Sequence, residues 1–208
     1  MCNYLEHVFI ISFWGSTRHE NVNNLKQSFS NSIIFPAIKE YDVAIHHSEF
    51  YKMYKYSSHP LITNWEYSLA LTHRNIYDLI LLNNYSCALI FESDAHLHPK
   101  FHEVMNQIKI PENFDILKVE HCEKKFRNST LIKLKHQHRP CTAGYLISRT
   151  GANKLRFLND PIWMNADGIM DNKHVESACR AKQSEIIKIN MYLVTPSIVI
   201  QTGYRHNS

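Results

Sequence analysis

The chain has 208 residues, of which 44% are hydrophobic and 20% are charged, as expected for a globular protein with a substantial core. Its net charge of +4 without a basic run suits small anionic ligands such as nucleotides, and is too weak to indicate a nucleic-acid partner. The N-terminal apolar run has no basic leader and is too short to span a membrane, so we expect neither a signal peptide nor a transmembrane segment. No linker divides the sequence, which predicts a single domain over residues 1–208.

The cysteines give an expectation about the compartment. There are five, Cys2, Cys87, Cys122, Cys141 and Cys179, and none forms a C-x-x-C pair. An odd number with scattered spacing favours reduced thiols and therefore a cytoplasmic protein.

Hydrophobic periodicity gives the expected elements in chain order. Apolar residues at helical spacing (Val22, Leu25, Phe29 and Ile33) predict a helix over residues 20–38. Pro99 is suited to open a later helix, and Thr150 is a suitable N-cap for another. The expected strands are 7–13, 41–47, 86–94, 114–121, 130–135 and 143–149, with strand-like runs over 185–201; the expected helices are 20–38, one or two over 60–86, 100–108, 150–160 and 174–182. Strands alternating with helices predict an α/β fold with a mostly parallel central sheet flanked by helices.

The segment ALIFESDAHLHP, residues 88–99, carries the first chemical signal. An apolar strand runs into Glu92 and Asp94, whose side chains point to the same side because side chains alternate along a strand. Ligands of α/β sheets bind beyond the carboxyl ends of the strands. Two carboxylates there can hold Mg²⁺ or Mn²⁺ together with substrate phosphates. The alternative is a polar strand end that enters a solvated turn.

Several segments together resemble glycosyltransferase family 25, which includes lipooligosaccharide and collagen galactosyltransferases. ALIFESDAHLHPKF is similar to the family's Ile-Leu-Glu-Asp-Asp-Ala segment, and CTAGYLISRTGANKL to its Thr-Ala-x-Tyr-Leu-Ile-Ser-Arg-x-Gly-Ala segment. The other similar segments, in the family's order, are HVFIISFWGSTRHENVNNL, SLALTHRNIYDLI, FDILKVE and PSIVIQTGYRHNS. The similarity extends over nearly the whole chain.

The resemblance implies a GT-A type fold and an inverting transfer of a hexose, galactose or glucose, from a UDP-sugar donor. It also implies a glycan, lipid-linked glycan or other hydroxyl acceptor, and Mn²⁺ or Mg²⁺. Asp94 becomes the principal metal ligand, assisted by Glu92, with His206 as a further candidate. The residues assigned to donor binding are Ser12, Arg18, His73, Glu92, Ser93 and Thr142. The chain departs from the family pattern at Ser93, where the family has an acid, and at Thr72, where it has serine.

An inverting transfer needs a base that deprotonates the acceptor hydroxyl. The segment NDPIWMNADGIMDN, residues 159–172, contains three aspartates, and the family has an aspartate in the comparable loop. We predict Asp167 as the base and Asp171 as the second choice. The alternative for Asp167 is a turn with Gly168 or a helix cap. Trp163 could stack on an acceptor sugar, although an aromatic residue under a loop is more often part of a core.

The sequence is also compatible with three other assignments. His96, His98 and His102 lie close together in sequence and are a minor candidate for zinc. A nucleotidyltransferase is disfavoured because the turn after the first strand, FWGSTRH, has one glycine and no phosphate-binding signature. A third possibility is a non-catalytic nucleotide-sugar binding module in which Ser93 records lost activity.

Overall fold

The computed structural model describes residues 2–13, 19–39, 62–120, 130–134, 141–160, 162–171, 176, 179 and 185–201. Arg18, Cys122, His206 and the strand expected over residues 41–47 lie outside this part, as does most of the helix expected over 174–182.

A seven-stranded sheet forms the centre of the molecule, in the order β2-β1-β3-β7-β5-β8-β6. The pairings of β1 with β2 and β3 and of β5 with β8 are parallel, and those of β7 with β3 and β5 and of β6 with β8 are antiparallel. Five strands therefore run one way while β6 and β7 run the other, which confirms the mostly parallel sheet. The strands are β1 (Val8–Ser12), β2 (Ile33–Pro36), β3 (Cys87–Glu92), β5 (Ile116–Lys118), β6 (Thr130–Leu134), β7 (Gly144–Ser148) and β8 (Met191–Thr195). A two-stranded sheet of β4 (Ala95–Leu97) and β9 (Val199–Gln201) lies beside it.

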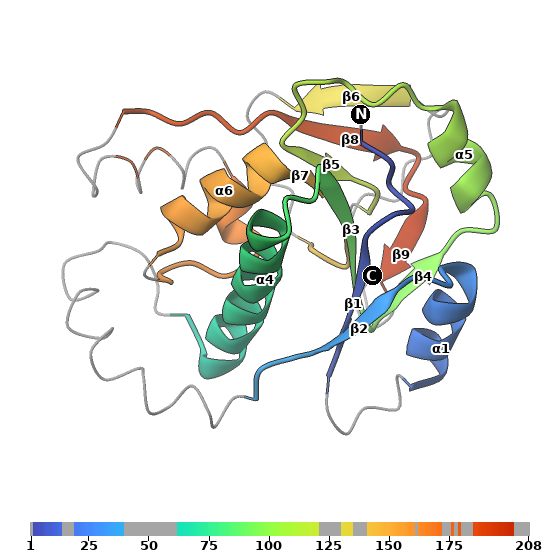
Figure 1. The fold of residues 1–208 in the computed structure, drawn as a ribbon, viewed down its shortest axis with the longest axis horizontal. Helices are drawn as coiled ribbons and strands as arrows, with labels where there is room; N and C mark the ends of the chain where they lie inside the picture. Colours follow the sequence, from blue (N-terminus) through green and yellow to red (C-terminus); the bar gives the residue numbers. More distant parts are fainter. Residues whose placement is uncertain are drawn as a thin grey trace, which may run out of the picture.

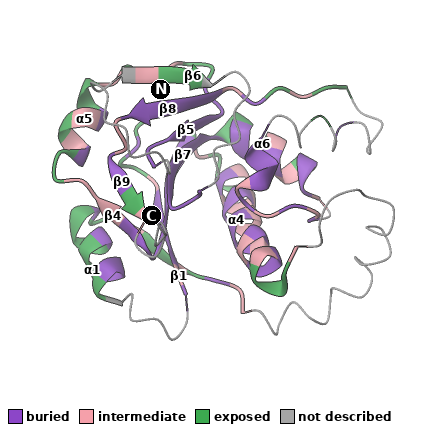
Figure 2. Cartoon of the chain, turned by 180° about the vertical axis from the view of Figure 1, so that it is seen from behind, coloured by how far each residue is buried: buried purple, intermediate pink, exposed green. Residues whose placement is uncertain are grey.

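Helices cover both faces of the central sheet (Figure 1). Phe9 and Ile11 of β1 belong to the core cluster that includes residues of α4 (Asn64–Leu82) and α6 (Arg149–Leu158). Val8 and Ile10 belong to the cluster on the other face, with residues of α1 (His19–Ser28) and α5 (Phe101–Gln107). The central strands are consequently buried on both sides, which explains their continuous apolar sequences (Figure 2).

Several predicted boundaries are corrected. The helix expected over residues 20–38 ends at Ser28, and Ile33–Pro36 pairs with β1 as β2 instead. Two β-branched residues and an aromatic residue, followed by proline, fit this edge strand. Ser148, rather than Thr150, caps α6, because its hydroxyl accepts a hydrogen bond from the Gly151 N–H at 3.0 Å. The short strand β4 was not predicted.

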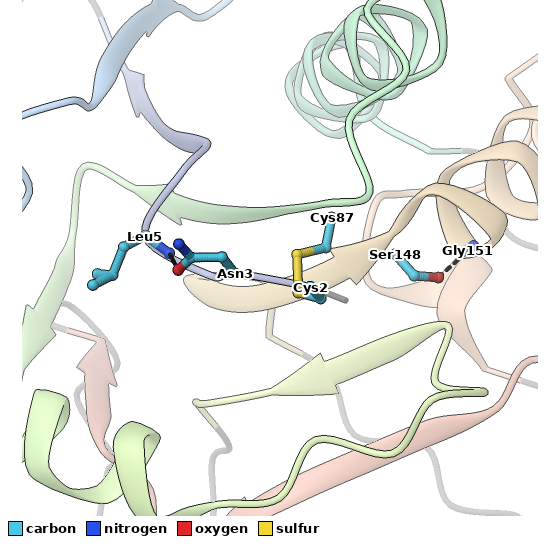
Figure 3. The surroundings of a disulfide bond; sticks show 6 residues. All are labelled: Cys2, Asn3, Leu5, Cys87, Ser148 and Gly151. Carbon is cyan, nitrogen blue, oxygen red and sulfur yellow. Dashed lines mark hydrogen bonds between the residues drawn. A yellow bond between two sulfur atoms is a disulfide. The ribbon is translucent and has the colours of Figure 1, made fainter.

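The prediction of reduced thiols is wrong for three cysteines. Cys2 and Cys87 form a disulfide with their Cα atoms 5.6 Å apart, so the N-terminal segment is tied to the first residue of β3 (Figure 3). Cys141 is also disulfide-bonded, whereas Cys179 is a buried thiol that forms no disulfide. Cys2 and Cys87 are 85 residues apart in sequence, so only the folded structure brings them together. In the described part of the chain, no helix has the length and apolar character needed to cross a membrane.

Candidate active site

A cavity of about 540 Å³ opens where β1 and β3 end, and its size is that of a small-molecule site. This is the edge of the sheet at which the sequence predicted a ligand site. One part of its lining is polar and comes from the ends of the strands: Glu92, Asp94, Cys141, Thr142 and Gln201. The rest comes from the end of β1, the start of α4 and the loop before the 3₁₀ turn Gly168–Met170: Phe13, Thr63, Trp65, Glu66, Leu69, Asn165, Ala166 and Asp167.

A short turn after β3 presents Asp94 to the cavity. The side-chain amide of Asn21, on α1, donates to the carbonyls of Ser93 and Ala95, both at 2.9 Å, and so fixes the turn on either side of Asp94. Gln201 at the end of β9 donates from Nε2 to Asp94 Oδ2 at 3.1 Å. Two segments distant in sequence therefore hold this carboxylate in place.

Glu92 is held by a different set of contacts. His73 Nε2 lies 3.2 Å from Glu92 Oε1, and the Thr142 hydroxyl donates to the same oxygen. On the other side of the imidazole, His73 Nδ1 lies 2.7 Å from the Tyr145 hydroxyl, which lies 2.9 Å from the Tyr77 hydroxyl. Glu92 is only 4% exposed, and His73 is 1% exposed.

The hydrogen atoms of this network can be assigned from its chemistry. If Glu92 is ionised and the imidazole is neutral, His73 Nε2 donates to Glu92 and Nδ1 accepts from Tyr145. The Tyr145 oxygen then accepts from Tyr77. Burial raises the pKa values of both tyrosines, which keeps their protons in place. All donors therefore point toward Glu92 and fix the position of its carboxylate.

Asp167 is positioned through Cys141. The Cys141 N–H donates to Asp167 Oδ2 at 3.3 Å, and the Cys141 carbonyl accepts from the fully buried Lys118 ammonium at 3.0 Å. Cys141 has a φ of 105°, a conformation that L-residues rarely adopt. Uncommon backbone conformations persist where the surroundings enforce them, and they cluster at functional sites.

Glu120 is an acid that the sequence analysis missed. It is 3% exposed, and burial raises the pKa of its carboxyl to about 8, further raised by the charges of Glu92 and Asp94 although Lys118 and the Ala143 N–H oppose this. Its Oε2 has no hydrogen-bond partner among the described residues. Glu120 therefore carries a proton at neutral pH beneath the acid pair.

The other predicted residues that the structure describes are not part of the cavity lining. His73 lies behind Glu92, and Ser93 is fully buried. Ser12 ends β1, where its carbonyl accepts from the Ala37 N–H. Asp171 is 8% exposed at the end of the 3₁₀ turn. Arg18 and His206 lie outside the described residues.

Trp163 takes a structural position, and the three histidines are not grouped as a metal site. The indole N–H of Trp163 donates to the Leu158 carbonyl at 2.8 Å, and the ring packs against two core clusters. Within the described ranges, no three or more His, Cys, Asp or Glu side chains are grouped so as to hold a metal ion, and this covers His96, His98 and His102.

The sequence did contain signals for two of the missed residues. Glu120 and Gln201 lie in FDILKVE and PSIVIQ, the segments singled out above. Trp65 and Phe13 had no such signal, because an aromatic residue at a helix start or a strand end is ordinary in a core.

Two sequence comparisons with known proteins agree with each other. Residues 5–135 match a family model described as "Glycosyltransferase family 25 (LPS biosynthesis protein)". A Haemophilus influenzae protein named "Putative glycosyltransferase" is 26% identical over 219 aligned positions, which cover 99% of this chain and 74% of the relative. Among solved structures, a glycosyltransferase involved in the glycosylation of the major capsid of PBCV-1 aligns with a TM-score of 0.39 and 11% identity. That alignment covers 74% of this chain and 66% of the other, just under two thirds, and is too weak to support an argument about fold or activity.

Proposed function

Since the chain belongs to glycosyltransferase family 25 and is a glycosyltransferase, we propose that it transfers galactose or glucose from a UDP-sugar to a hydroxyl of a glycan or lipid-linked glycan, with inversion and with Mn²⁺ or Mg²⁺. The observation that carries the proposal is the cavity at the carboxyl end of β3, into which Asp94 and Asp167 both face. The family match favours a glycosyltransferase over a nucleotidyltransferase and over a non-catalytic nucleotide-sugar binding module.

The sheet supports a GT-A type fold as part of this proposal. Five strands run in one direction, and the acid pair follows one of them at the edge where open α/β sheets bind ligands. The donor would lie with its diphosphate toward Asp94 and Gln201, at the strand-end side of the cavity.

A divalent ion fits this side of the cavity with Asp94 as its protein ligand. Glu92 Oε1 already accepts from His73 and Thr142, so Glu92 would act mainly by orienting the site. Mg²⁺ and Mn²⁺ are commonly held by one or two carboxylates together with substrate phosphates, and this suits a site without a three-residue cluster in the described part of the chain. When bound, the ion would neutralise negative charge on the leaving diphosphate.

Asp167 is our candidate base, and the chemistry balances as a single displacement. The acceptor oxygen forms a bond to the anomeric carbon on the face opposite the diphosphate, and its proton passes to the Asp167 carboxylate. The bond from the anomeric carbon to the phosphate oxygen breaks, and UDP leaves with the electron pair. The Cys141 N–H, which donates to Asp167 Oδ2, keeps the carboxylate oriented in the cavity.

The cytoplasmic location belongs to the same proposal, and the cysteines now argue against it. Disulfides persist in oxidising compartments, and Cys2–Cys87 is one. Rapid alkylation of the protein in intact cells, followed by peptide mass spectrometry, distinguishes the cytoplasm from an oxidising compartment. Alkylated Cys2 and Cys87 support the cytoplasm, and an intact disulfide between them excludes it.

Release of UDP from UDP-galactose and UDP-glucose, with a panel of glycoside acceptors and with manganese or chelator, tests the proposal. We expect metal-dependent UDP release by the wild type and a loss of at least about 100-fold in Asp94→Asn. Glu103→Gln, an exposed acid on α5, is the matched control and should match the wild type. Thermal stabilisation by UDP with manganese should also be lost in Asp94→Asn. UDP release that is equal with chelator and with manganese would overturn the metal dependence, and no release from either donor would overturn the transfer.

A further inference from the structure

We propose that Trp65, backed by Phe13, is the platform on which the acceptor sugar stacks, an inference that rests on the proposed function. Trp65 lines the cavity and is 45% exposed, although it is a large aromatic residue on the first turn of α4. The ring of Phe13, at the end of β1, lies 4.7 Å from it between centroids, tilted by 41°, and is 6% exposed. The indole is thus supported by a buried neighbour while much of its own surface remains accessible.

The surroundings of Trp65 connect it to the candidate base. Glu66, the next residue, accepts from Asn165 Nδ2 at 3.3 Å through Oε1, and its Oε2 accepts from the Thr63 backbone N–H at 2.7 Å. Asn165 lies two residues before Asp167, and its Oδ1 accepts from the Gly168 N–H at 3.0 Å. The start of α4 and the loop that carries Asp167 are therefore linked by a hydrogen bond beside the cavity.

This connection decides which substrate reaches Trp65. The base must touch the hydroxyl that it deprotonates, so the acceptor lies against Asp167 and the donor diphosphate on the far side of the reacting carbon. Trp65 lies at the start of α4, which is hydrogen-bonded to the loop that carries Asp167, and is consequently on the acceptor side. Asp94 and Gln201, held together by their own hydrogen bond, mark the diphosphate side.

Charge supports the same assignment. Glu66, the residue after Trp65, and Asp167 both line the cavity, and without an ion bound to them their carboxylates would repel a diphosphate. At Asp94 and Glu92 the proposed divalent ion would offset this repulsion. They suit the hydroxyl groups of a neutral sugar, which donate hydrogen bonds to carboxylates. The negative face of the indole attracts the slightly positive C–H groups on one face of a pyranose ring. A neutral pyranoside therefore matches both the aromatic and the acidic part of this end of the cavity.

Fluorine NMR on protein labelled with 5-fluorotryptophan tests the platform without requiring turnover. The chain has three tryptophans, and the resonance that disappears in Trp65→Phe identifies Trp65. We expect methyl galactoside, methyl glucoside, methyl N-acetylglucosaminide or lactose to shift this resonance, and the shift to persist at saturating UDP with manganese. A glycoside shift that UDP abolishes, a shift with UDP alone, or no shift with any glycoside would overturn the proposal; the first two would assign Trp65 to the donor nucleoside.

Kinetics with whichever glycoside supports transfer provide the second test. Trp65→Ala should raise the KM for the acceptor about ten-fold, equivalent to about 1.4 kcal/mol, with a much smaller rise in the KM for the UDP-sugar. Trp65→Phe should recover most of the loss, because it keeps an aromatic face. Leu82→Ala, an exposed apolar residue at the far end of α4, should match the wild type. A rise in the donor KM larger than the rise in the acceptor KM would overturn the platform while leaving the proposed transfer intact. A wild type that releases no UDP would refute the transfer, and the NMR result would still stand.

Discussion

Replacing Glu120 by glutamine removes a titrating group from beneath the acid pair, and its effect can be worked out from the structure. The carboxyl has a pKa of about 8 in the folded protein against a model value of 4.5, chiefly because it is buried. Between these pH values the folded protein holds a proton that the unfolded chain releases. A raised pKa therefore contributes stability that is complete below pH 4.5 and is lost as the pH rises through about 8.

The magnitude follows from the size of the pKa shift. Each pH unit in this window changes the free energy of unfolding by about 1.4 kcal/mol for one proton. The wild type should lose about 3 kcal/mol relative to Glu120→Gln between pH 4.5 and 7, and about 4 kcal/mol by pH 8. Titrating groups common to both proteins cancel in the difference of their free energies of unfolding, so the pH dependence of that difference is due to Glu120.

Urea unfolding of both proteins across this pH range measures the difference. Glu112→Gln, at an exposed position before β5, is the control and should run parallel to the wild type. Parallel curves for Glu120→Gln and the wild type would mean that Glu120 keeps an ordinary pKa in the fold, and the reasoning from burial would be wrong. A divalent ion bound at Asp94 should lower the pKa of Glu120, since positive charge favours the carboxylate, and should reduce the slope.

The remaining predictions concern the disulfide, the base and the buried network. Cys2→Ser should lower the free energy of unfolding by about 2 to 5 kcal/mol in the absence of reductant, since the bond to Cys87 closes a loop of 85 residues. In dithiothreitol the variant and the wild type should have the same free energy of unfolding. Equal stability without reductant would show that the bond does not form. Asp167→Asn should lower kcat by about 100-fold or more while Asp171→Asn remains active, and the reverse pattern would transfer the role of base to Asp171. Tyr145→Phe should cost about 1 kcal/mol of stability, read by urea unfolding, and should lower kcat because His73 Nδ1 loses its partner; a kcat like that of the wild type would mean that the network does not orient Glu92.

The position of the acid pair could be predicted because it depends on local pattern and on one rule of topology. A continuous apolar run ending in Glu92 and Asp94 indicates a buried strand, and strand ends of such sheets carry the site. The side chains that hold the pair could not be predicted, because they come from distant segments. Gln201 is 107 residues from Asp94 in sequence, and Asn21 is 72 residues from Ser93. Local patterns cannot reveal contacts of this range.

The short range of sequence patterns also explains the predictions that were wrong. The helix expected over residues 20–38 rested on helical spacing that continues through Ile33, but that segment gains parallel pairing with β1 instead. Trp163 and Trp65 both had the chemistry for a sugar contact. Only the packed structure distinguishes them, with the indole N–H of Trp163 bonded to a backbone carbonyl and Trp65 at the cavity.

The structure also changes the meaning of the departure at Ser93. In the family pattern this position is an acid, so serine suggested the loss of a metal ligand. Ser93 is fully buried behind the turn and is not part of the cavity lining, whereas Asp94 is. An ion in the cavity would therefore meet the same carboxylate with or without an acid at residue 93. The two remaining acids are held differently: Glu92 is oriented by donors from the core, and Asp94 is presented to the cavity by the turn that Asn21 fixes.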